Sequence, residues 1–269
     1  MKHTLLLTLI FGIEVSAQNN NEPLGILHAQ QIGSQIEQAK AVFSGAEVVT
    51  VGEQADCDFN SLKSGLQEAI NSGATIIRIA DSIYRNNLII DDLSVEITGG
   101  FDTCADALAN HPNGEQQLID GQSSPTPVLS IRGSTQRNTV SLNNLIFTRG
   151  NNGQLNASGG VNVIQADVFV TMDNVHLANN FGAFGGGLAV INGDADLYLN
   201  DSLIFGNVAE NGGGVHCSGP NSSILMDGKT GVYFNEADGD GGGVHIGRLC
   251  FFRLFRKCIL FPTYIFRYP

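Results

Sequence analysis

The chain has 269 residues, of which 42% are hydrophobic, and it carries a formal net charge of −12. This apolar content is enough for a sizeable core and excludes a largely disordered chain. The negative charge argues against a nucleic-acid partner, because the phosphates would be repelled.

Residues 1–17 have the layout of a secretory signal peptide. Lys2 and His3 precede a short apolar run, and Val15 and Ala17 supply the small residues of a cleavage site. The run is too short to span a bilayer, and the alternative interpretation is a buried N-terminal helix. Export predicts a secreted or cell-surface protein, with its five cysteines in an oxidising compartment.

Residues 18–55 are predicted to be an N-terminal leader. The segment that follows, FNSLKSGLQEAI over residues 59–70, is typical of an amphipathic helix. Its apolar face carries Leu62, Leu66, Ala69 and Ile70. Because strand-like segments come directly after it, we expect this helix to cap the end of a solenoid.

The cysteines differ in their surroundings. Cys57 and Cys104 flank the first structured segment, and we expect them to form a disulfide. Cys217 falls within a strand-like pattern and is predicted to be a small core residue. Cys250 and Cys258 belong to the final segment, and none of the five has the spacing of a metal-binding Cys-x-x-Cys motif.

A Gly-Gly-apolar motif recurs along the second half of the chain, as SGGVNV, GGGLAV, GGGVHC and GGGVHI. The last glycines of these motifs are residues 160, 187, 214 and 243, so the spacings are 27, 27 and 29 residues. Each repeat holds three short segments: Gly-Gly-apolar-x-apolar, then apolar-x-apolar before Asn or Asp, then apolar-x-x-Asn. The alternation with a period of two is typical of strands, so we expect three strands in each coil. Less regular strand-like segments continue the pattern upstream, over residues 74–101 and 128–147.

Strands this short cannot bury a face alone, but stacked repeats share a continuous core. The repeat therefore predicts an all-β, right-handed parallel β-helix solenoid over residues 56–247, its handedness taken from the general preference of parallel crossovers. The predicted inward-facing residues are Val161, Val163, Leu188, Val190, Val215, Cys217, Val244 and Ile246 on one wall, Leu197, Leu199, Ile224 and Met226 on a second, and Leu177 and Ile204 on a third.

Three asparagines, Asn180, Asn207 and Asn235, share one register of the repeat. We expect them to form a structural ladder, with their amides hydrogen-bonded along the axis at the strand spacing of about 4.8 Å. The glycines that follow them allow tight turns. A phosphate-binding loop is excluded, because neither a Lys-Ser/Thr pair nor a helix follows the glycines.

The repeats IFGNVAENGGGV (residues 204–215) and LANNFGAFGGGL (residues 177–188) resemble the polymorphic outer membrane protein repeat. That repeat pairs an aromatic-or-aliphatic-x-x-Asn motif with a Gly-Gly-apolar motif. The front of the chain, from CDFNSLKSGLQEAI to ITGGFDTC, is similar to the opening of secreted bacterial proteins with the pectin-lyase-like β-helix. These resemblances imply a fold rather than an activity, since that fold hosts adhesins, surface-protein passengers, polysaccharide lyases and hydrolases.

Candidate catalytic groups are sparse in the repeats. A polysaccharide lyase needs clustered carboxylates for calcium and a base, and its paired-Asp and Gly-His-Gly motifs are missing from the sequence. A glycosidase can instead assemble a carboxylate pair from separate coils, and Asp173, Asn200 and Asp227 form one axial row. The favoured interpretation of this row is a ladder of turn-forming side chains, so we expect no catalytic residues.

Two further groups of residues bear on metal binding. Asp238 and Asp240 lie two residues apart among glycines and resemble part of a calcium loop, but without the distal Glu of an EF-hand. The favoured interpretation is a solvated Gly/Asp turn, so no cofactor is expected, and calcium bound at this turn is the alternative. His216 and His245 share one register and are expected to be outward-facing surface histidines, since a metal site would need a third ligand.

The composition changes abruptly in residues 248–269, where phenylalanine, arginine and cysteine crowd a segment that lacks Gly, Asp, Asn and Glu. Three interpretations remain open: a reading-frame change or truncation, a basic aromatic membrane-binding segment, or a C-terminal cap. The first is favoured, because a solenoid should end in a polar-faced cap.

These features predict a secreted or cell-surface β-helix protein of the structural or adhesion type, without catalytic activity. Its expected partner is a glycan or another cell-surface ligand, and it is expected to associate with an outer membrane. The alternative is a polysaccharide lyase or glycoside hydrolase of the pectin-lyase-like class.

Overall fold

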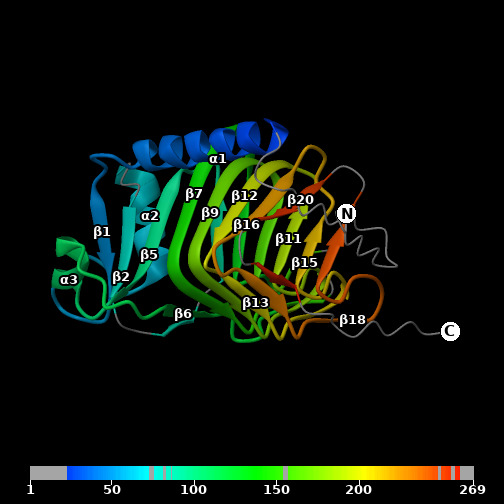
Figure 1. Ribbon diagram of the computed structural model, residues 1–269. Helices are drawn as coiled ribbons and strands as arrows, with labels where there is room; N and C mark the ends of the chain where they lie inside the picture. Colours follow the sequence, from blue (N-terminus) through cyan, green and yellow to red (C-terminus); the bar gives the residue numbers. More distant parts are fainter. Residues whose placement is uncertain are drawn as a thin grey trace.

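The computed structural model describes residues 23–72, 76–80, 83–85, 87–153, 157–247, 250–255 and 258–260. Over these residues the chain forms a parallel β-solenoid of about seven turns, as the repeat predicts. Figure 1 shows the turns stacked beside one another, from β1 at one end to β20 towards the other. The predicted signal peptide, residues 1–17, lies outside the described residues.

Three walls of parallel strands run along the solenoid and belong to one continuous sheet. The first wall contains β4 (Leu88–Asp91), β11 (Leu188–Ile191), β15 (Val215–Cys217) and β19 (Val244–Ile246). The second contains β1 (Val48–Val51), β2 (Ile76–Ala80), β5 (Val95–Phe101), β12 (Asp194–Asn200), β16 (Ser223–Asp227) and β20 (Phe251–Leu254). The third contains β3 (Tyr84–Arg85), β6 (Gln117–Asp120), β13 (Leu203–Phe205), β17 (Gly231–Tyr233) and β21 (Ile259–Leu260). Two long strands, β7 (Leu129–Thr148) and β9 (Val161–Ala178), bend around the corners and contribute to all three walls.

Strands at matching positions of successive turns pair in parallel and in register. On the first wall, Leu188 pairs with Val161 on one side and with Val215 on the other, and Val215 pairs in turn with Val244. A repeat of nearly constant length returns each residue to the same angular position. Side chains of one kind therefore stack along the axis.

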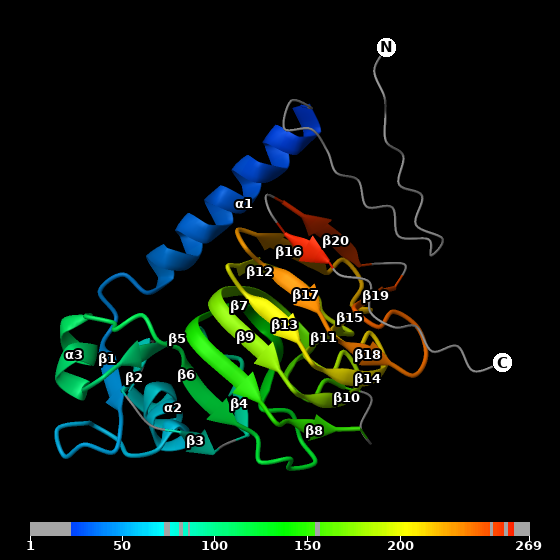
Figure 2. The same cartoon turned by 60° about the horizontal axis from the view of Figure 1, so that its bottom comes forward.

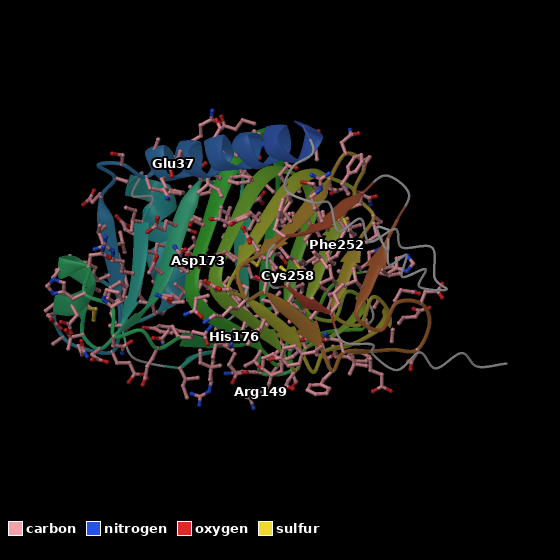
Figure 3. All side chains as sticks on the ribbon, in the orientation of Figure 1. Glu37, Arg149, Asp173, His176, Phe252 and Cys258 are labelled. Atoms are coloured by element: carbon pink, nitrogen blue, oxygen red, sulfur yellow. A yellow bond between two sulfur atoms is a disulfide. The ribbon has the colours of Figure 1, made fainter. Side chains whose placement is uncertain are left out.

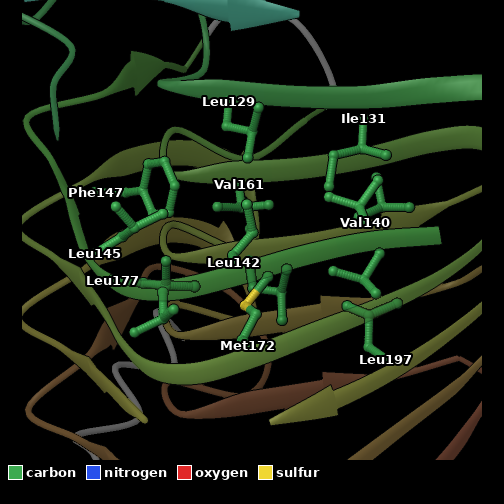
Figure 4. Close-up of a cluster of buried hydrophobic side chains, with 14 of the residues drawn as sticks. Leu129, Ile131, Val140, Leu142, Leu145, Phe147, Val161, Met172, Leu177 and Leu197 are labelled. Carbon is green, nitrogen blue, oxygen red and sulfur yellow. The ribbon is translucent and has the colours of Figure 1, made fainter. Parts of the chain in front are cut away.

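The inward-facing side chains form one continuous hydrophobic core. Figure 4 shows part of it, with Leu142, Leu145 and Phe147 gathered between the strands beside Val161. All the predicted inward-facing residues belong to this core except Ile246, which is half-buried at its edge. Burying one such aliphatic or aromatic side chain stabilises the fold by about 1.5–3 kcal/mol, so the stacked walls supply the main driving force for folding.

The central turns contain a fourth strand that the sequence pattern did not predict. β8 (Asn151–Asn152), β10 (Phe181–Phe184), β14 (Val208–Asn211) and β18 (Glu236–Ala237) form a separate four-stranded parallel sheet, visible at the lower right of Figure 2. The expectation of three strands per coil was therefore wrong for these turns. These segments mix small, polar and aromatic residues, so the apolar alternation that reveals the other strands is missing.

The N-terminal end of the solenoid carries helix α2 (Leu62–Ser72), which lies where a capping helix was predicted. Leu62 and Leu66 are buried in the core, and α2 packs against β1 and β2. A disulfide joins Cys57 to Cys104, the pair expected from their positions, with the two Cα atoms 5.3 Å apart. It ties the loop before α2 to the start of helix α3 (Cys104–Ala109).

The predicted leader, residues 18–55, contains two elements that its sequence did not reveal. Helix α1 (Pro23–Val42) lies above the strands in Figure 1, and Figure 2 shows that its N-terminal end extends away from them. Strand β1 pairs with β2, so the solenoid begins at Val48 rather than at residue 56. Within the described part of the chain, no helix is both long and apolar enough to cross a membrane.

The described part of the final segment continues the solenoid. β20 pairs in register with β16, and β21 pairs in register with β17. Cys217 is buried in the core as predicted, but it also forms a disulfide with Cys250, which corrects the expectation that it acts only as a small core residue. The chain returns to the same corner one turn later, and this brings the two Cα atoms within 6.0 Å. The reading-frame interpretation of residues 248–269 stays a prediction.

Candidate binding site on the third wall

The Asn ladder, formed by Asn180, Asn207 and Asn235, runs buried along the corner that follows the third wall. Asn180 Nδ2 donates to Asn207 Oδ1 at 3.1 Å, and Asn207 Nδ2 donates to Asn235 Oδ1 at 2.9 Å. Asn207 Nδ2 also donates to the Leu177 carbonyl at 2.8 Å. The structure thus brings together the three predicted residues, and their polar groups are satisfied inside the scaffold.

The outer row, formed by Asp173, Asn200 and Asp227, lies side by side on the outer face of the second wall. Asn200 Nδ2 donates to Asp173 Oδ1 at 2.9 Å, and the Tyr198 hydroxyl donates to Asp227 Oδ2 at 3.3 Å. Burial and the neighbouring Asp227 carboxylate raise the pKa of Tyr198 to about 12, so its phenol remains a hydrogen-bond donor at neutral pH. In this row Asn200 is therefore hydrogen-bonded to Asp173, whereas Asp227 is held by Tyr198.

The Gly/Asp turn at Asp238 and Asp240 is exposed and follows β18. The Asp240 N–H donates to Asn211 Oδ1 at 3.0 Å, and the Asp240 carbonyl accepts from the Gly212 N–H at 2.8 Å. Among the residues that the structure describes, no group of three or more His, Cys, Asp and Glu side chains gathers as a metal site would require. Calcium binding by this turn stays a prediction.

The two histidines that share one register stack on each other, with the ring centroids of His216 and His245 5.0 Å apart. His216 is not a surface residue, however, because only 6% of it is exposed and the Phe184 ring lies 4.8 Å away. Burial, with a smaller contribution from His245, lowers the pKa of His216 to about 4, so its imidazole is neutral at pH 7. Stacked imidazoles hold their nitrogen lone pairs in parallel planes, which do not converge on one metal ion.

Aromatic side chains gather on the outer face of the third wall, where the sequence suggested no site. Phe205 on β13 pairs with Tyr233 on β17, and their rings stack at 5.5 Å with planes 9° apart. Phe234 follows Tyr233 and meets it edge to face at 5.4 Å. We call Phe205, Tyr233 and Phe234 the aromatic row. His176 on β9 lies edge-on to Phe205 at 6.1 Å, and burial lowers the pKa of this imidazole.

The third wall ends at a corner where one residue in each of four successive turns adopts the left-handed backbone conformation. These residues are Arg149, Asn179, Gly206 and Phe234, with φ of 56°, 55°, 63° and 53°, and we call them the corner row. Backbone hydrogen bonds join them across turns, from the Asn179 N–H to the Phe205 carbonyl at 3.2 Å and from the Gly206 N–H to the Phe234 carbonyl at 3.1 Å. Glycine and asparagine adopt this conformation readily, whereas a bulky phenylalanine rarely does.

Phe234 is the exception in the corner row, because its backbone conformation is unfavourable for a phenylalanine and its ring is open to solvent. It is 79% exposed, the largest exposed fraction among the large hydrophobic residues described. The left-handed conformation costs a residue with a Cβ about 1 kcal/mol, and an exposed ring recovers little of this by burial. The corner imposes this conformation in each of the four turns, and in the last of them it carries a bulky ring that solvent can reach, so Phe234 becomes a candidate binding residue.

At the other end of the corner row, Arg149 is anchored to the third wall. Its Nε donates to Oδ1 of the buried Asp120 at 2.8 Å, and its Nη2 pairs with the other carboxylate oxygen. The hydrogen bonds from Arg149 hold the pKa of Asp120 below its usual range. Figure 3 shows Arg149 below His176, at the lower edge of the solenoid.

A shallow groove lies at the corner between the first and second walls. It has a volume of about 520 Å³, and its lining includes Gln165, Asp167, Asn192, Asp194 and Asn221. Arg137 pairs with Asp167 at 2.9 Å and with Asp196 at 2.6 Å. The amides and carboxylates that line the groove are suited to hydrogen-bonding a polar ligand. None of these lining residues was singled out from the sequence as a candidate site.

No family model, curated protein or solved structure matches the chain. The resemblance to polymorphic outer membrane protein repeats and to pectin-lyase-like proteins therefore stays a prediction beyond the β-solenoid fold itself. The repeat did contain a signal for the corner row, because the residues before the three ladder asparagines are Asn179, Gly206 and Phe234. That signal was missed because the repeat was read only for its apolar, asparagine and glycine positions.

Proposed function

We propose that this chain is a secreted or cell-surface β-solenoid of the structural or adhesion type, which binds a partner through the aromatic and corner rows and catalyses no reaction. The observation that carries the proposal is the exposed, backbone-strained Phe234 beside the stacked rings of Phe205 and Tyr233. Aromatic rings on a rigid support supply a large contact area at a small cost in conformational entropy.

The scaffold beneath this surface favours a binding role. The Asn ladder bonds each central turn to the next directly behind the corner row, and the continuous core fills the interior. Rigid support keeps a binding group in its productive geometry before the partner arrives, which lowers the entropic cost of association. A solenoid also presents its outward side chains at a regular spacing, as extended recognition surfaces do.

Two acidic side chains of the repeats, Asp173 and Asp196, have partners that favour structural roles. Asp173 accepts a hydrogen bond from Asn200, and Asp196 is bonded to both Arg137 and Ser223. A carboxylate that acts in catalysis needs access to substrate in addition to such partners. These carboxylates bond neighbouring turns to each other, as expected of side chains that support a scaffold.

Binding by the wild-type chain is the direct test. Full-length protein, fluorescently labelled, is applied to epithelial cells and to immobilised oligosaccharides. We expect saturable binding to at least one of these surfaces, competed by unlabelled protein. A protein that binds neither surface contradicts the proposal, and cleavage of a polysaccharide by the same preparation would replace it.

The secretion part of the proposal rests on residues 1–17 alone. When the chain is expressed with its own N-terminus in a bacterial host, we expect the exported form to begin at Gln18. N-terminal sequencing of the extracytoplasmic fraction measures this. A chain that retains residues 1–17 and stays in the cytosol contradicts the predicted signal peptide.

A second candidate function, action on polysaccharides, is favoured by the groove at the corner of the first and second walls. Asp167 and Asp194 pair in adjacent turns there, so two carboxylates line one surface. A screen of acidic polysaccharides with and without calcium tests it, with Asp167→Asn as the inactivating variant and Asp173→Asn in the outer row as the control. Release of no product under either condition removes this candidate.

A further inference from the structure

We propose that residues 181–187 form an acid-sensitive flap, which opens when His216 beneath it takes up a proton. The flap combines a glycine-rich segment, one aromatic ring that covers the imidazole, and firm attachments before and after it. This device goes beyond the proposed binding function, because it makes the covering of the first wall depend on pH.

The ring of Phe184 covers His216 from the side of the preceding turn. The centroids of these two rings are 4.8 Å apart, and the His245 ring stacks at 5.0 Å from the side of the following turn. His216 is therefore enclosed along the axis between two rings. In the turn of Phe184, the register position of His216 is held by Ala189, which is wholly buried and too small to stack. Figure 2 shows β10, which carries Phe184, beside the first wall.

The flap is loosely built between two firm attachments. Asn180 before it belongs to the Asn ladder, and the Leu188 N–H after it donates to a carbonyl of the next turn at 3.0 Å. Four of the seven residues between them are glycines, which regain much backbone entropy on opening. Phe181 is 46% exposed and Phe184 is half-buried, so little hydrophobic burial opposes a local opening.

Protonation of His216 is incompatible with the closed flap. Its Nδ1 atom is buried and has no hydrogen-bond partner among the described residues. A neutral imidazole carries a proton on one nitrogen, whereas an imidazolium carries one on both, so Nδ1 would become a buried, charged donor without an acceptor. Opening of the flap admits water to this nitrogen, and water then supplies the missing acceptor.

No carboxylate offsets this cost on the described elements that surround His216. β10 and β11 carry no titratable side chain, and β19 carries His245, whose charge would add to the cost. Glu210 on β14 and Asp240 after β18 are exposed. Burial is the main cause that lowers the pKa of His216 to about 4, and His245 is the second.

The expected size of the effect follows from the pKa values of the closed and open flap. The pKa of His216 is about 4 when the flap is closed, and we expect the ordinary value of about 6.5 when it is open. The open state thus binds the proton more tightly, so the equilibrium constant for opening should rise about 20-fold between pH 7 and pH 5. The contribution of His216 to closure is fully present above pH 6.5 and is lost as the pH falls towards 4.

Three substitutions separate the parts of the device. His216→Ala removes the titrating group and supplies the residue that Ala189 provides one turn earlier. Phe184→Asn removes the covering ring and supplies the residue that Asn211 provides one turn later. His245→Phe is the matched control, because it keeps a ring in the stack but has no titrating nitrogen.

Hydrogen exchange of the full chain measures the opening. The N–H groups of Ala183 and Gly185 report on it, because they donate across the closed flap at 3.1 Å and 2.9 Å. Their protection, corrected for the intrinsic effect of pH on exchange, should fall about 20-fold between pH 7 and pH 5 in the wild type and in His245→Phe. In His216→Ala it should not change. At both pH values, protection in the flap should lie at least tenfold below that in β5.

Proton NMR of the imidazole tests the covering ring independently. His245→Phe assigns the His216 resonance by elimination of its neighbour. In the wild type, His216 should titrate with a pKa of about 4. In Phe184→Asn its pKa should rise towards about 6.5, because water then reaches the ring at all times.

Four results would overturn the inference. Equal protection in the flap and in β5 at both pH values would mean that His216 is protonated only when the whole chain unfolds. A 20-fold loss of flap protection that persists in His216→Ala, or that disappears in His245→Phe, would place the trigger elsewhere. An unchanged pKa of His216 in Phe184→Asn would show that the ring of Phe184 does not enclose the imidazole.

Discussion

Two rows of polar side chains run along the same solenoid and differ in what they contribute. The Asn ladder (Asn180, Asn207, Asn235) and the outer row (Asp173, Asn200, Asp227) each recur in step with the repeat and place one residue in each turn. Both are joined by hydrogen bonds of about the same length, 2.9 Å from Asn207 to Asn235 and 2.9 Å from Asn200 to Asp173. Contact geometry alone therefore does not distinguish them.

Burial does distinguish them. The ladder asparagines are almost wholly enclosed, whereas Asp173 is exposed and Asn200 is half-buried. A buried amide that loses its partner cannot turn to water, so the full cost of the unsatisfied group falls on the fold. An exposed amide recovers its hydrogen bonds from solvent. The same spacing in sequence thus produces one buried row that stabilises the stacking of the turns and one surface row that contributes little to it.

The largest effect is expected when a carboxylate is placed in the ladder. Asn207→Asp removes the Nδ2 donor and sets an anionic oxygen against two acceptors, Asn235 Oδ1 and the Leu177 carbonyl. Asn180 still donates to one carboxylate oxygen, but a buried charge without a counter-ion costs about 4 kcal/mol, so we expect a loss of this size in the free energy of unfolding. Urea denaturation at pH 7 measures it. A loss below about 1 kcal/mol would break the comparison, because burial would then not control the cost.

Removing the ladder amide altogether should cost less. Asn207→Ala leaves the backbone N–H of Asn180 without its acceptor, which now lies 2.9 Å away, and opens a small cavity. We expect a loss of about 3 kcal/mol in the same assay. The matched control is Asn200→Ala in the outer row, for which we expect at most about 0.5 kcal/mol. Equal losses for the two alanine variants would contradict the distinction.

A further set of residues stacked along the axis, His216 and His245, extends the comparison to the dependence of stability on pH. The folded state lowers the pKa of His216 to about 4, whereas an unfolded histidine titrates near 6.5, so the unfolded state binds the proton more readily. The contribution of His216 is fully present above pH 6.5 and is lost as the pH falls towards 4, by about 2 kcal/mol at pH 5. Urea midpoints at pH 7 and pH 5 measure this.

The control for the pH experiment comes from the repeat. Ala189 holds the position of His216 in the preceding turn, so His216→Ala should fold while it removes the titrating group. The drop in stability between pH 7 and pH 5 should be smaller in this variant by about 2 kcal/mol. If the variant and the wild type lose the same stability between pH 7 and pH 5, the burial of His216 is not the cause of the pH dependence.

A smaller loss than in the ladder, though larger than that of the Asn200→Ala control, is expected when the carboxylate is placed in the outer row. Asn200→Asp sets three carboxylates in adjacent turns, between Asp173 and Asp227, and replaces an amide donor by a like charge. Because solvent screens these groups, we expect a loss of about 1 kcal/mol at low salt, and less at high salt. Thermal unfolding in 20 mM and 500 mM NaCl separates the two conditions. A loss as large as that of Asn207→Asp, or one insensitive to salt, would contradict the assignment.

The fold was largely predictable because a solenoid is a local pattern repeated. Residues such as Val161, Leu188 and Val215 recur at nearly constant spacing, and constant spacing alone requires that they stack. The small fourth sheet was missed because its strands, for example Val208–Asn211, have no apolar alternation and are positioned by the turns on either side. Helix α1 was missed as well, since nothing in its sequence marks an apolar face clearly.

The candidate site was less predictable. Phe234 occupies a position that Asn179 and Gly206 occupy in earlier turns, so its place in the repeat was readable in advance. Its left-handed backbone and its exposure were not, because both depend on how the corner is built and on what covers it. The pairing of Cys217 with Cys250 was not predicted either. The final segment does not continue the glycine motif that marks each earlier turn, so the register of Cys250 could not be assigned from the sequence.

The sequence by itself determined that this protein is a parallel solenoid, which residues line its core and which residues share a register, because these properties follow from period alone. Only the tertiary structure decided which of the two polar registers is buried, since the burial of a polar side chain depends on the neighbouring turns and on the loops that cover a face. It thereby made the Asn207 row a structural ladder and the Asn200 row a surface feature. It also left the ring of Phe234 open to solvent, where a ligand can reach it.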